Sequence, residues 1–481
     1  MVVPARGSST PDAIVVGAGP NGLTAAVLLA RAGLSVQVIE AGDTPGGGCR
    51  SGEVTLPGFV HDLCSAVHPM GALSPVFRDI GLERFGVMWV PSAHPLAHPL
   101  PDGDVAVLER SPAATGGSLG PDGAAWEALL RPFADERFVH SLLNPIWDLG
   151  GGMLLKKARF GLVALRSCES VARSRFKGPA ARALFAGCAA HSVMALDRAG
   201  TAAFGLVLAA TAHVIDWPCA RGGSQEITRA LVRALESHGG TLQLRTRVTS
   251  LADLPAARAV LFDLSPVQVA EICGNALPAR HREKFAAFRH GPGVFKIDWA
   301  LREPIPWRNP ECHRAMTVHV CGAFEDVLRS ESDVMSGRAP EQPFVLVAQQ
   351  SAVDPTRAPP GRQTGWAYCH VPNGCAIDMT DRIETQIERF APGFRDCILA
   401  RRSTSPAQLA AHNPTMIGGD MAGGQNNLGQ FLFRPVLRLN PYTTPNPRLF
   451  LCSGSTPPGG GVHGMCGYHA ARTVLRRVFG K

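Results

Sequence analysis

Three glycines at fixed spacing are the residues that point most directly to chemistry. The pattern G-x-G-x-x-G consists of Gly17, Gly19 and Gly22, with Pro20 and Asn21 inside it. It directly follows the apolar run 13–16, which has the composition of a buried parallel strand. The first glycine permits a tight turn, the second lets a pyrophosphate approach the backbone, and the third lets the next helix pack closely. We therefore expect a phosphate site where a helix over 23–31 begins, because helix N-termini favour anions.

An acidic residue, Glu40, follows these glycines at the sequence spacing typical of a ribose-binding carboxylate. The apolar run 35–39 predicts a second strand that ends at Glu40 and Ala41, and a carboxylate roughly 20 residues past the glycines accepts hydrogen bonds from ribose hydroxyls. It would repel a 2′-phosphate, so NAD and FAD remain as candidates and NADP is disfavoured. A second cradle for phosphate then follows, made of Gly46, Gly47, Gly48 and Arg50. A simple NAD dehydrogenase does not need it. We therefore expect FAD.

Together with 58–62, these motifs resemble the N-terminal FAD signature of phytoene desaturases and their relatives among the flavin amine oxidases. The segments 222–248 and 449–478 are similar to the central and C-terminal motifs of that family, so the resemblance covers nearly the whole chain. It is closest to the phytoene dehydrogenase-related branch, whose name does not imply a carotenoid substrate. The resemblance implies further flavin contacts at Val248, Gly454, Gly461, His463, Gly464 and Met465.

The spread of these motifs predicts a discontinuous α/β fold. Segments 11–75, 218–290 and 440–481 would form one Rossmann-type FAD-binding domain of the glutathione-reductase-like kind. The insertion 76–217 is rich in alanine, leucine and arginine in its second half, and we expect a helical cap. The insertion 291–439 contains several strand-like runs and would form a mixed-sheet substrate domain.

The composition excludes several other classes. With 481 residues, of which 45% are hydrophobic, the chain can bury two or three cores. The formal charge of +8 comes without a basic and aromatic module, so nucleic acid is not expected as a partner. The 13 cysteines lack zinc-site spacing, which indicates reduced thiols in a cytoplasmic protein and no metal. The longest apolar run, 202–215, falls short of the roughly 18 residues that span a bilayer.

The segment 154–182 concentrates positive charge against one acid, Glu169. Its basic residues are Lys156, Lys157, Arg159, Arg166, Arg173, Arg175, Lys177 and Arg182. One interpretation is a solvated helical face. The other is a patch for an anionic membrane surface or for a second copy of the chain, beside a substrate entrance. The resemblance favours a peripheral membrane position, because phytoene desaturases take lipid-soluble substrates from membranes.

His463 is the candidate catalytic residue. A flavin that accepts hydride develops negative charge at N1 and C2=O, and the helix N-terminus at 461–465 would stabilise that charge. Many phytoene desaturases have proline where this chain has His463. Its imidazole could hydrogen-bond the flavin, position substrate or act as acid or base; alternatively, it caps its own helix or packs on the ring. Lys296 lies in an alternating strand. A lysine near the flavin N5 holds a water in some flavin oxidases, but here we expect the side chain to be exposed on the opposite face.

Two motifs that are absent from the sequence narrow the range of possible reactions. It contains no second dinucleotide motif and no C-x-x-x-x-C redox pair, so electrons should pass from non-covalent FAD to oxygen, a quinone or a carrier protein. We expect an FAD-dependent dehydrogenase or oxidase that removes hydride from a C–H bond of a small apolar or lipid-like substrate. One alternative is a redox-neutral FAD-dependent isomerase. Another is a binding or chaperone protein like the Rab GDP-dissociation inhibitors, although the intact glycines and Glu40 argue against it.

Overall fold

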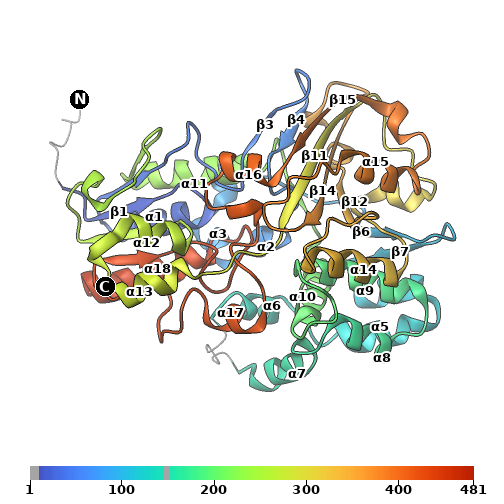
Figure 1. The fold of residues 1–481 in the computed structure, drawn as a ribbon, viewed down its shortest axis with the longest axis horizontal. Coiled ribbons are helices and arrows are strands. Elements are labelled where there is room, and N and C mark those ends of the chain that lie inside the picture. Colours follow the sequence, from blue (N-terminus) through green and yellow to red (C-terminus); the bar gives the residue numbers. More distant parts are fainter. Residues whose placement is uncertain (1–9, 146–151) are drawn as a thin grey trace.

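The computed structural model describes residues 10–145 and 152–481. A parallel sheet of five strands forms one end of the molecule, and the first glycine motif directly follows its middle strand (Figure 1). Its order is β16 (Leu449–Leu451), β10 (Ala259–Phe262), β1 (Ala13–Val16), β2 (Val36–Ile39) and β9 (Thr241–Gln243). The strands come from distant parts of the chain, and the predicted α/β, Rossmann-type fold is confirmed.

Helices cover both faces of this sheet, which is why its strands are apolar throughout. Ala13 and Val15 of β1 face one core, whereas Ile14 and Val16 face the other. The first core contains α1 (Pro20–Arg31), α11 (Gln225–Ser237) and α18 (Met465–Val474), and the second contains α12 (Pro266–Cys273) and α13 (Ala279–Ala286). Gly467 lets α18 approach α1, because a Cβ there would lie 1.9 Å from the carbonyl oxygen of Asn21.

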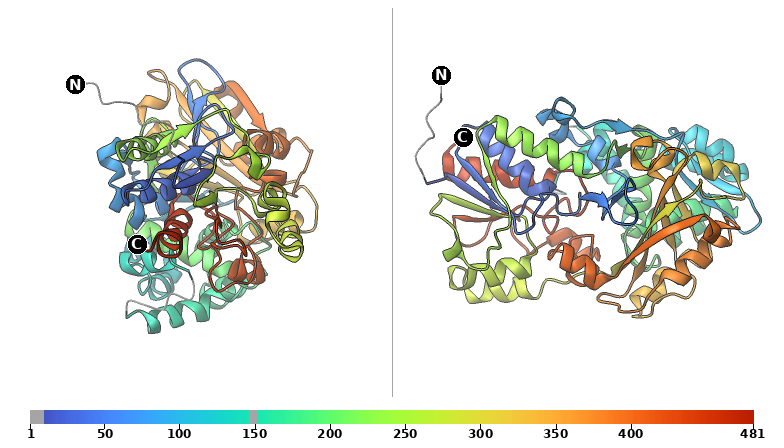
Figure 2. Two further views of the ribbon diagram at one scale, coloured as in Figure 1. Left: turned by 90° about the vertical axis from the view of Figure 1, so that its left-hand side faces the viewer. Right: turned by 90° about the horizontal axis from the view of Figure 1, so that it is seen from above.

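A second, mixed sheet lies toward the other end of the long axis (Figure 2). Its order is β15 (Ile398–Thr404), β11 (Gly293–Leu301), β14 (Gln363–Val371), β13 (Val345–Ala348), β12 (Ala315–Val320), β6 (His94–Pro99) and β7 (Val105–Leu108). Segment 76–217 is therefore helical in its second half, as expected, but its first half also supplies β6 and β7. Alternating valines in β7 favour a strand there. The domain boundaries themselves stay a prediction.

Helices also pack on both faces of the second sheet. One face carries α9 (Pro179–Ala190), which contacts α8 (Cys168–Arg175), α10 (Thr201–Val214) and α14 (Phe324–Met335). The other face is covered by α15 (Thr380–Glu388). Because of this cover, even the polar side chains of the central strands are buried.

The remaining elements surround these two layers. The short strand pairs are β3 (Ser51–Glu53) with β4 (Val60–Asp62), and β5 (Trp89–Val90) with β8 (Cys219–Ala220). The other α-helices are α2 (Pro69–Ala72), α3 (Pro75–Ile80), α4 (Pro112–Ser118), α5 (Gly123–Leu130), α6 (Glu136–Leu142), α7 (Leu154–Ala164), α16 (Pro406–His412) and α17 (Leu428–Phe433). None of the helices in the described ranges is long and apolar enough to cross a membrane.

Candidate active site

A cavity of about 710 Å³ extends from the glycine loops of the first sheet to one face of the second. Most of the predicted cofactor residues line it: Gly17, Gly19, Pro20, Asn21, Glu40, Ala41, Gly47, Gly48, Arg50, Val248, Gly454, Gly461 and His463. Gly22, Gly46, Gly464 and Met465 do not line it. The structure thus brings together motifs that are more than 400 residues apart in the chain.

Glu40 is fixed at the end of β2 by backbone amides. Its Oε2 accepts a hydrogen bond from the N–H of Ala18 at 2.8 Å, and its Oε1 accepts one from the N–H of Gly42 at 2.7 Å. Arg50 forms an ion pair with Oε1 at 3.4 Å and donates to the carbonyl of His412 at 3.1 Å. Arg50 thus holds the carboxylate in place, and its predicted contact with phosphate stays a prediction.

A carboxyl group that the sequence motifs did not reveal lies against the N-terminus of α1. Asp263 follows β10, and its Oδ2 accepts a hydrogen bond from the N–H of Gly22 at 2.9 Å. A Cβ at Gly19 would lie 2.5 Å from the same oxygen. Burial raises the pKa of Asp263 to about 7. The position of Asp263 after a central parallel strand is a signal that could have identified it, because ligands bind at that edge of such sheets.

The residues at this end fit the pyrophosphate of a dinucleotide. A Cβ at Gly47 would lie 3.1 Å from the Cα of Gly19, so the two glycine runs meet where phosphate would approach. The buried Nε of Arg50 has no hydrogen-bond partner among the described residues. A buried cationic donor without a partner is costly, and a bound phosphate would satisfy it.

His463 caps the helix that it precedes. Its Nδ1 accepts a hydrogen bond from the N–H of Met465 at 3.0 Å, and Gly464 between them has a φ of 68°. The imidazole is buried, which lowers its pKa to about 4 and keeps it neutral. This contact matches the alternative interpretation of a helix cap, and a role for the imidazole in catalysis stays a prediction.

Lys296 is buried, contrary to the expectation of an exposed side chain. It lies on β11, whose two faces are both covered, and it pairs with Asp298. Its Nζ lies 5.6 Å from the ring centroid of Trp366, which lines the cavity. Alternation along β11 predicts one buried and one exposed face. The strand β4 covers the Lys296 face, where His61 lies 3.6 Å from Asp298, and α15 covers the opposite face, so neither face reaches solvent.

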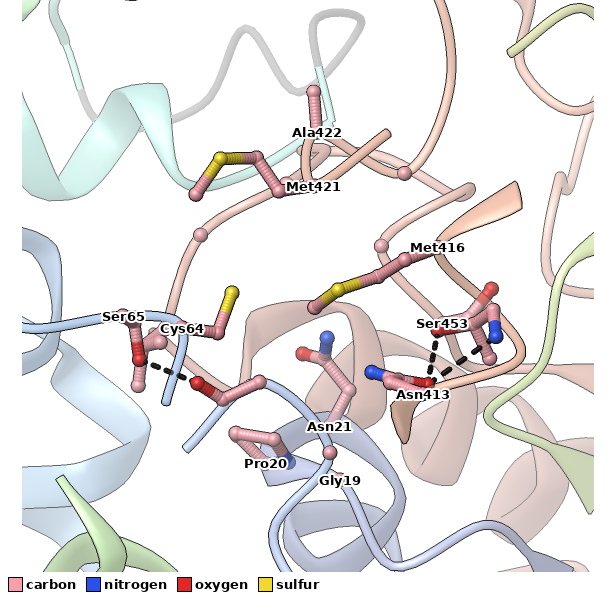
Figure 3. Close-up of a pocket in the computed structure, with 18 of the residues that line it drawn as sticks. Gly19, Pro20, Asn21, Cys64, Ser65, Asn413, Met416, Met421, Ala422 and Ser453 are labelled. Atoms are coloured by element: carbon pink, nitrogen blue, oxygen red, sulfur yellow. Dashed lines mark hydrogen bonds between the residues drawn. The ribbon is translucent and has the colours of Figure 1, made fainter. Parts of the chain in front are cut away.

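The cavity is predominantly apolar at the end away from the dinucleotide motifs. Its walls there include Phe204, Val207, Trp217, Leu346, Trp366 and Phe431. Figure 3 shows Gly19, Pro20 and Asn21 on one side, with the side chains of Cys64, Met416 and Met421 pointing into the space beyond them. No local pattern identifies these walls, because they come from separate helices, strands and loops.

Comparisons with known proteins support the Rossmann-type fold described above. A model of the NAD(P)-binding Rossmann-like domain matches residues 15–80. The chain is 23% identical to the lycopene-forming phytoene desaturase of a Paracoccus species, over 96% of each chain. This similarity to the phytoene desaturases is of low identity but extends over nearly the full length of both chains. It is also 25% identical to the mouse pyridine nucleotide-disulfide oxidoreductase domain-containing protein 2, over 97% of this chain and 93% of the mouse protein.

Solved structures show the same fold at low identity. Putrescine oxidase bound to putrescine is 16% identical, with a TM-score of 0.62 over 98% of this chain and 99% of its own. A fatty acid isomerase from P. acnes that produces CLA is also 16% identical, with a TM-score of 0.57 over 97% of this chain and 98% of its own. The chain therefore has the fold of known oxidoreductases over nearly its full length.

Proposed function

We propose that the protein is an FAD-dependent oxidoreductase that removes hydride from a C–H bond of a small, largely apolar substrate. The observation that carries this proposal is the continuous cavity, with a dinucleotide cradle at one end and apolar walls at the other. Bound FAD would accept the hydride and pass electrons to oxygen, a quinone or a carrier protein. The whole-length similarity to a phytoene desaturase and to a limonene dehydrogenase chain of Castellaniella defragrans supports this class of reaction.

The protein's own residues would bind and orient the reactants. The N-terminal end of α1 and the glycines packed against it would bind pyrophosphate, while Glu40, held by Ala18 and Gly42, would accept the ribose hydroxyls. The cap formed by His463 fixes the first turn of α18, whose N-terminal end would face developing negative charge. The apolar walls would exclude water from the reacting carbon.

The flavin content of purified protein tests this proposal first. We expect a yellow protein from which acid releases FAD, since no covalent link is proposed. Anaerobic titration with a library of apolar metabolites should bleach the flavin when a substrate is added, and an acceptor should restore the colour. Protein that neither contains flavin nor takes it up would contradict the proposal.

A redox-neutral isomerase is the second candidate, because a fatty acid isomerase shares the fold. Product formation without consumption of any acceptor would identify it. Stable flavin binding with no conversion of any apolar compound would instead favour a binding or chaperone protein.

We also propose that α7 and the segment after α17 form a docking surface for an anionic membrane. Four leucines of this surface are well exposed on or beside α7: Leu154, Leu155, Leu162 and Leu165. Phe433, Leu437 and Leu439 are exposed at and after α17. The basic side chains of α7 would contact anionic lipid headgroups while the leucines enter the acyl region.

The position of this surface supports the proposal. Both α7 and α17 contact α10, and the rings of Phe204 on α10 and Phe431 on α17 lie 6.0 Å apart. Both phenylalanines also line the cavity. A lipid-like substrate could therefore leave the bilayer close to the cavity, and the protein would be cytoplasmic and peripheral.

Co-sedimentation with liposomes tests the docking surface. Wild-type protein should require anionic lipid and lose binding with salt, because exposed charges are screened over about 10 Å at 0.1 M. Reversal of five charges, at Lys156, Lys157, Arg159, Arg173 and Arg175, or the pair Leu155→Ser and Leu162→Ser, should reduce recovery with lipid and leave flavin binding intact. Leu399→Ser, on β15, is the matched control and should sediment like wild type. If the leucine pair instead converts a dimer to a monomer without changing sedimentation, this surface joins two copies of the chain.

A further inference from the structure

Tyr368 places a hydroxyl group at the apolar end of the cavity. It lies on β14 two residues after Trp366, so the two side chains share one face of the strand. Leu346 of β13 is directly opposite Tyr368 in the strand register. All three residues line the cavity, so this part of the second sheet forms its wall.

The hydroxyl of Tyr368 is available to a ligand. It forms no hydrogen bond with the described residues, and its oxygen is not one of their buried, unpartnered polar atoms, so it remains accessible. The residue as a whole is only 7% exposed and belongs to a buried cluster with Trp366 and Leu409. The little surface that Tyr368 exposes, its hydroxyl included, therefore faces the cavity that it lines.

This hydroxyl is a hydrogen-bond donor at physiological pH. Burial raises the pKa of the Tyr368 phenol above its ordinary value, so the group keeps its proton. The hydrogen rotates about the C–O bond and can turn toward an acceptor on the ligand. Tyrosine hydroxyls in buried positions usually have a partner. A bound ligand would supply the partner that the described residues do not.

The charged groups beside Tyr368 are already paired. Lys296 of β11 is opposite Tyr368 in the strand register, and it forms an ion pair with Asp298. The Nδ1 of His370, two residues after Tyr368, lies 2.9 Å from a carboxylate oxygen of Glu331. A charged ligand group would therefore meet no unpaired counter-ion among these residues, and burial of an unpaired charge is costly.

We propose that the cavity selects an apolar molecule with an uncharged carbonyl group, whose oxygen accepts a hydrogen bond from the hydroxyl of Tyr368. A carbonyl suits this site better than an alcohol. Whichever of two hydroxyls donates, the hydrogen of the other is left without an acceptor, whereas a carbonyl brings no hydrogen of its own. The proposal names the substrate class of the proposed oxidoreductase and rests on that function only for turnover, because binding can be measured separately.

Infrared spectroscopy of a bound probe tests this contact in purified wild-type protein. The probe is methyl hexyl ketone with an isotope-labelled carbonyl, whose band is separate from those of the protein. A hydrogen bond from a phenol weakens the C=O bond, so we expect the band at a lower frequency than in hexane. In Tyr368→Phe, which removes one oxygen atom and keeps the ring, the band should return to its position in hexane.

Calorimetry with two matched ligands measures the size of the effect. The second ligand is the alkene in which a methylene group replaces the carbonyl oxygen of the ketone. Tyr368→Phe should weaken ketone binding about two- to tenfold, the loss of one net hydrogen bond, and leave alkene binding unchanged. Each ligand is compared with itself, so the different solubilities of the two cancel. Tyr468→Phe, whose hydroxyl contacts Arg472 outside this cavity, is the matched control and should bind both like wild type.

An unshifted band in wild type would overturn the proposal, as would a shift that survives Tyr368→Phe. Equal weakening of ketone and alkene would also overturn it, because Tyr368 would then only shape the wall. So would tighter binding of octanoate than of the ketone, since the site would then favour a charge. The infrared measurement on wild type needs no variant, so it remains decisive if Tyr368→Phe fails to fold. Protein that cannot take up flavin yet shifts the band would contradict the proposed function and support this inference.

Discussion

The two ends of the cavity are built to bind in different ways. At the dinucleotide end, backbone N–H groups, close-packed glycines and one fixed carboxylate, Glu40, form the cradle. At the other end, side chains from several helices and strands form apolar walls. A cradle of backbone groups needs a particular short sequence, whereas a wall of side chains needs only the right shape in space. The backbone cradle can therefore be recognised in the sequence as a motif, and the side-chain wall cannot.

The largest loss of stability should come from breaking the buried ion pairs that join the dinucleotide-binding part of the molecule to the part built on the second sheet. Arg357 is fully buried, and it pairs with Asp62 of β4 at 3.0 Å and with Asp354 at 2.9 Å. Arg357→Ala leaves two carboxylates without their cation, so we expect a loss of about 3 to 5 kcal/mol in the free energy of unfolding. Denaturant unfolding measures this, with the exposed Arg362→Ala as control. A loss below about 1 kcal/mol would show that the two regions are held together by other contacts.

The next largest effect is expected on FAD affinity when Glu40, the carboxylate at the dinucleotide end of the cavity, is removed. Glu40→Ala removes the acceptor for the ribose hydroxyls, and we expect FAD affinity to fall about tenfold to hundredfold. Titration of flavin-free protein with FAD measures this change. Glu53→Ala, an exposed acid on β3, should have no effect. Unchanged affinity in Glu40→Ala would mean that the backbone cradle alone is sufficient.

A smaller effect should depend on pH through Asp263. Its pKa is raised from 3.8 to about 7, so the folded protein keeps this carboxyl protonated where the unfolded chain has lost the proton. Its contribution to stability should therefore fall as pH rises from about 4 to about 7 and then level off. Above about pH 7 the charged group also lies at the N-terminus of α1, where it would repel pyrophosphate.

We expect FAD affinity to fall on the order of tenfold between pH 6 and pH 8 in wild type and to change little in Asp263→Asn. FAD titration at both pH values in both proteins measures this difference. The same pH dependence in the variant would assign it to another group.

The smallest effect is expected for His463→Ala. Loss of a helix cap costs about 0.5 to 2 kcal/mol, and the variant should retain FAD and be reduced by substrate at nearly the wild-type rate. Thermal unfolding and stopped-flow reduction measure the two quantities. Slowing by about 10² to 10⁴ would instead assign the imidazole a role as acid or base.

The sequence predicts local features well and distant contacts poorly. The strands β1 and β2, the helix α1 and the positions of Glu40 and Gly47 follow from short motifs whose residues interact with near neighbours. Asp263 contacts Gly22 across 241 residues, and no spacing rule connects them. The pairing of β6 with β12 likewise joins residues about 220 positions apart, so the approach of His98 to His319 is not visible in the sequence.

The exposed and buried positions of the second sheet and of the helices around it are also hard to predict. Alternation along its strand places Lys296 on a solvent-facing side, but burial depends on how many layers cover a sheet. The exposed leucines of α7 escape prediction for a similar reason. A leucine on a helix normally indicates a core contact, and only the packed structure shows that Leu155 and Leu162 are exposed among the described residues.

The late position of β16 and α18 in the chain has a consequence for biosynthesis. The edge of β10 and one side of α1 are covered by these last elements, which begin at Leu449 and Met465. Synthesis must therefore proceed beyond Leu449 before the first sheet can close and beyond Met465 before α1 is covered. Until then the nascent chain exposes an unpaired strand edge and an apolar helix face, which are common sites of aggregation.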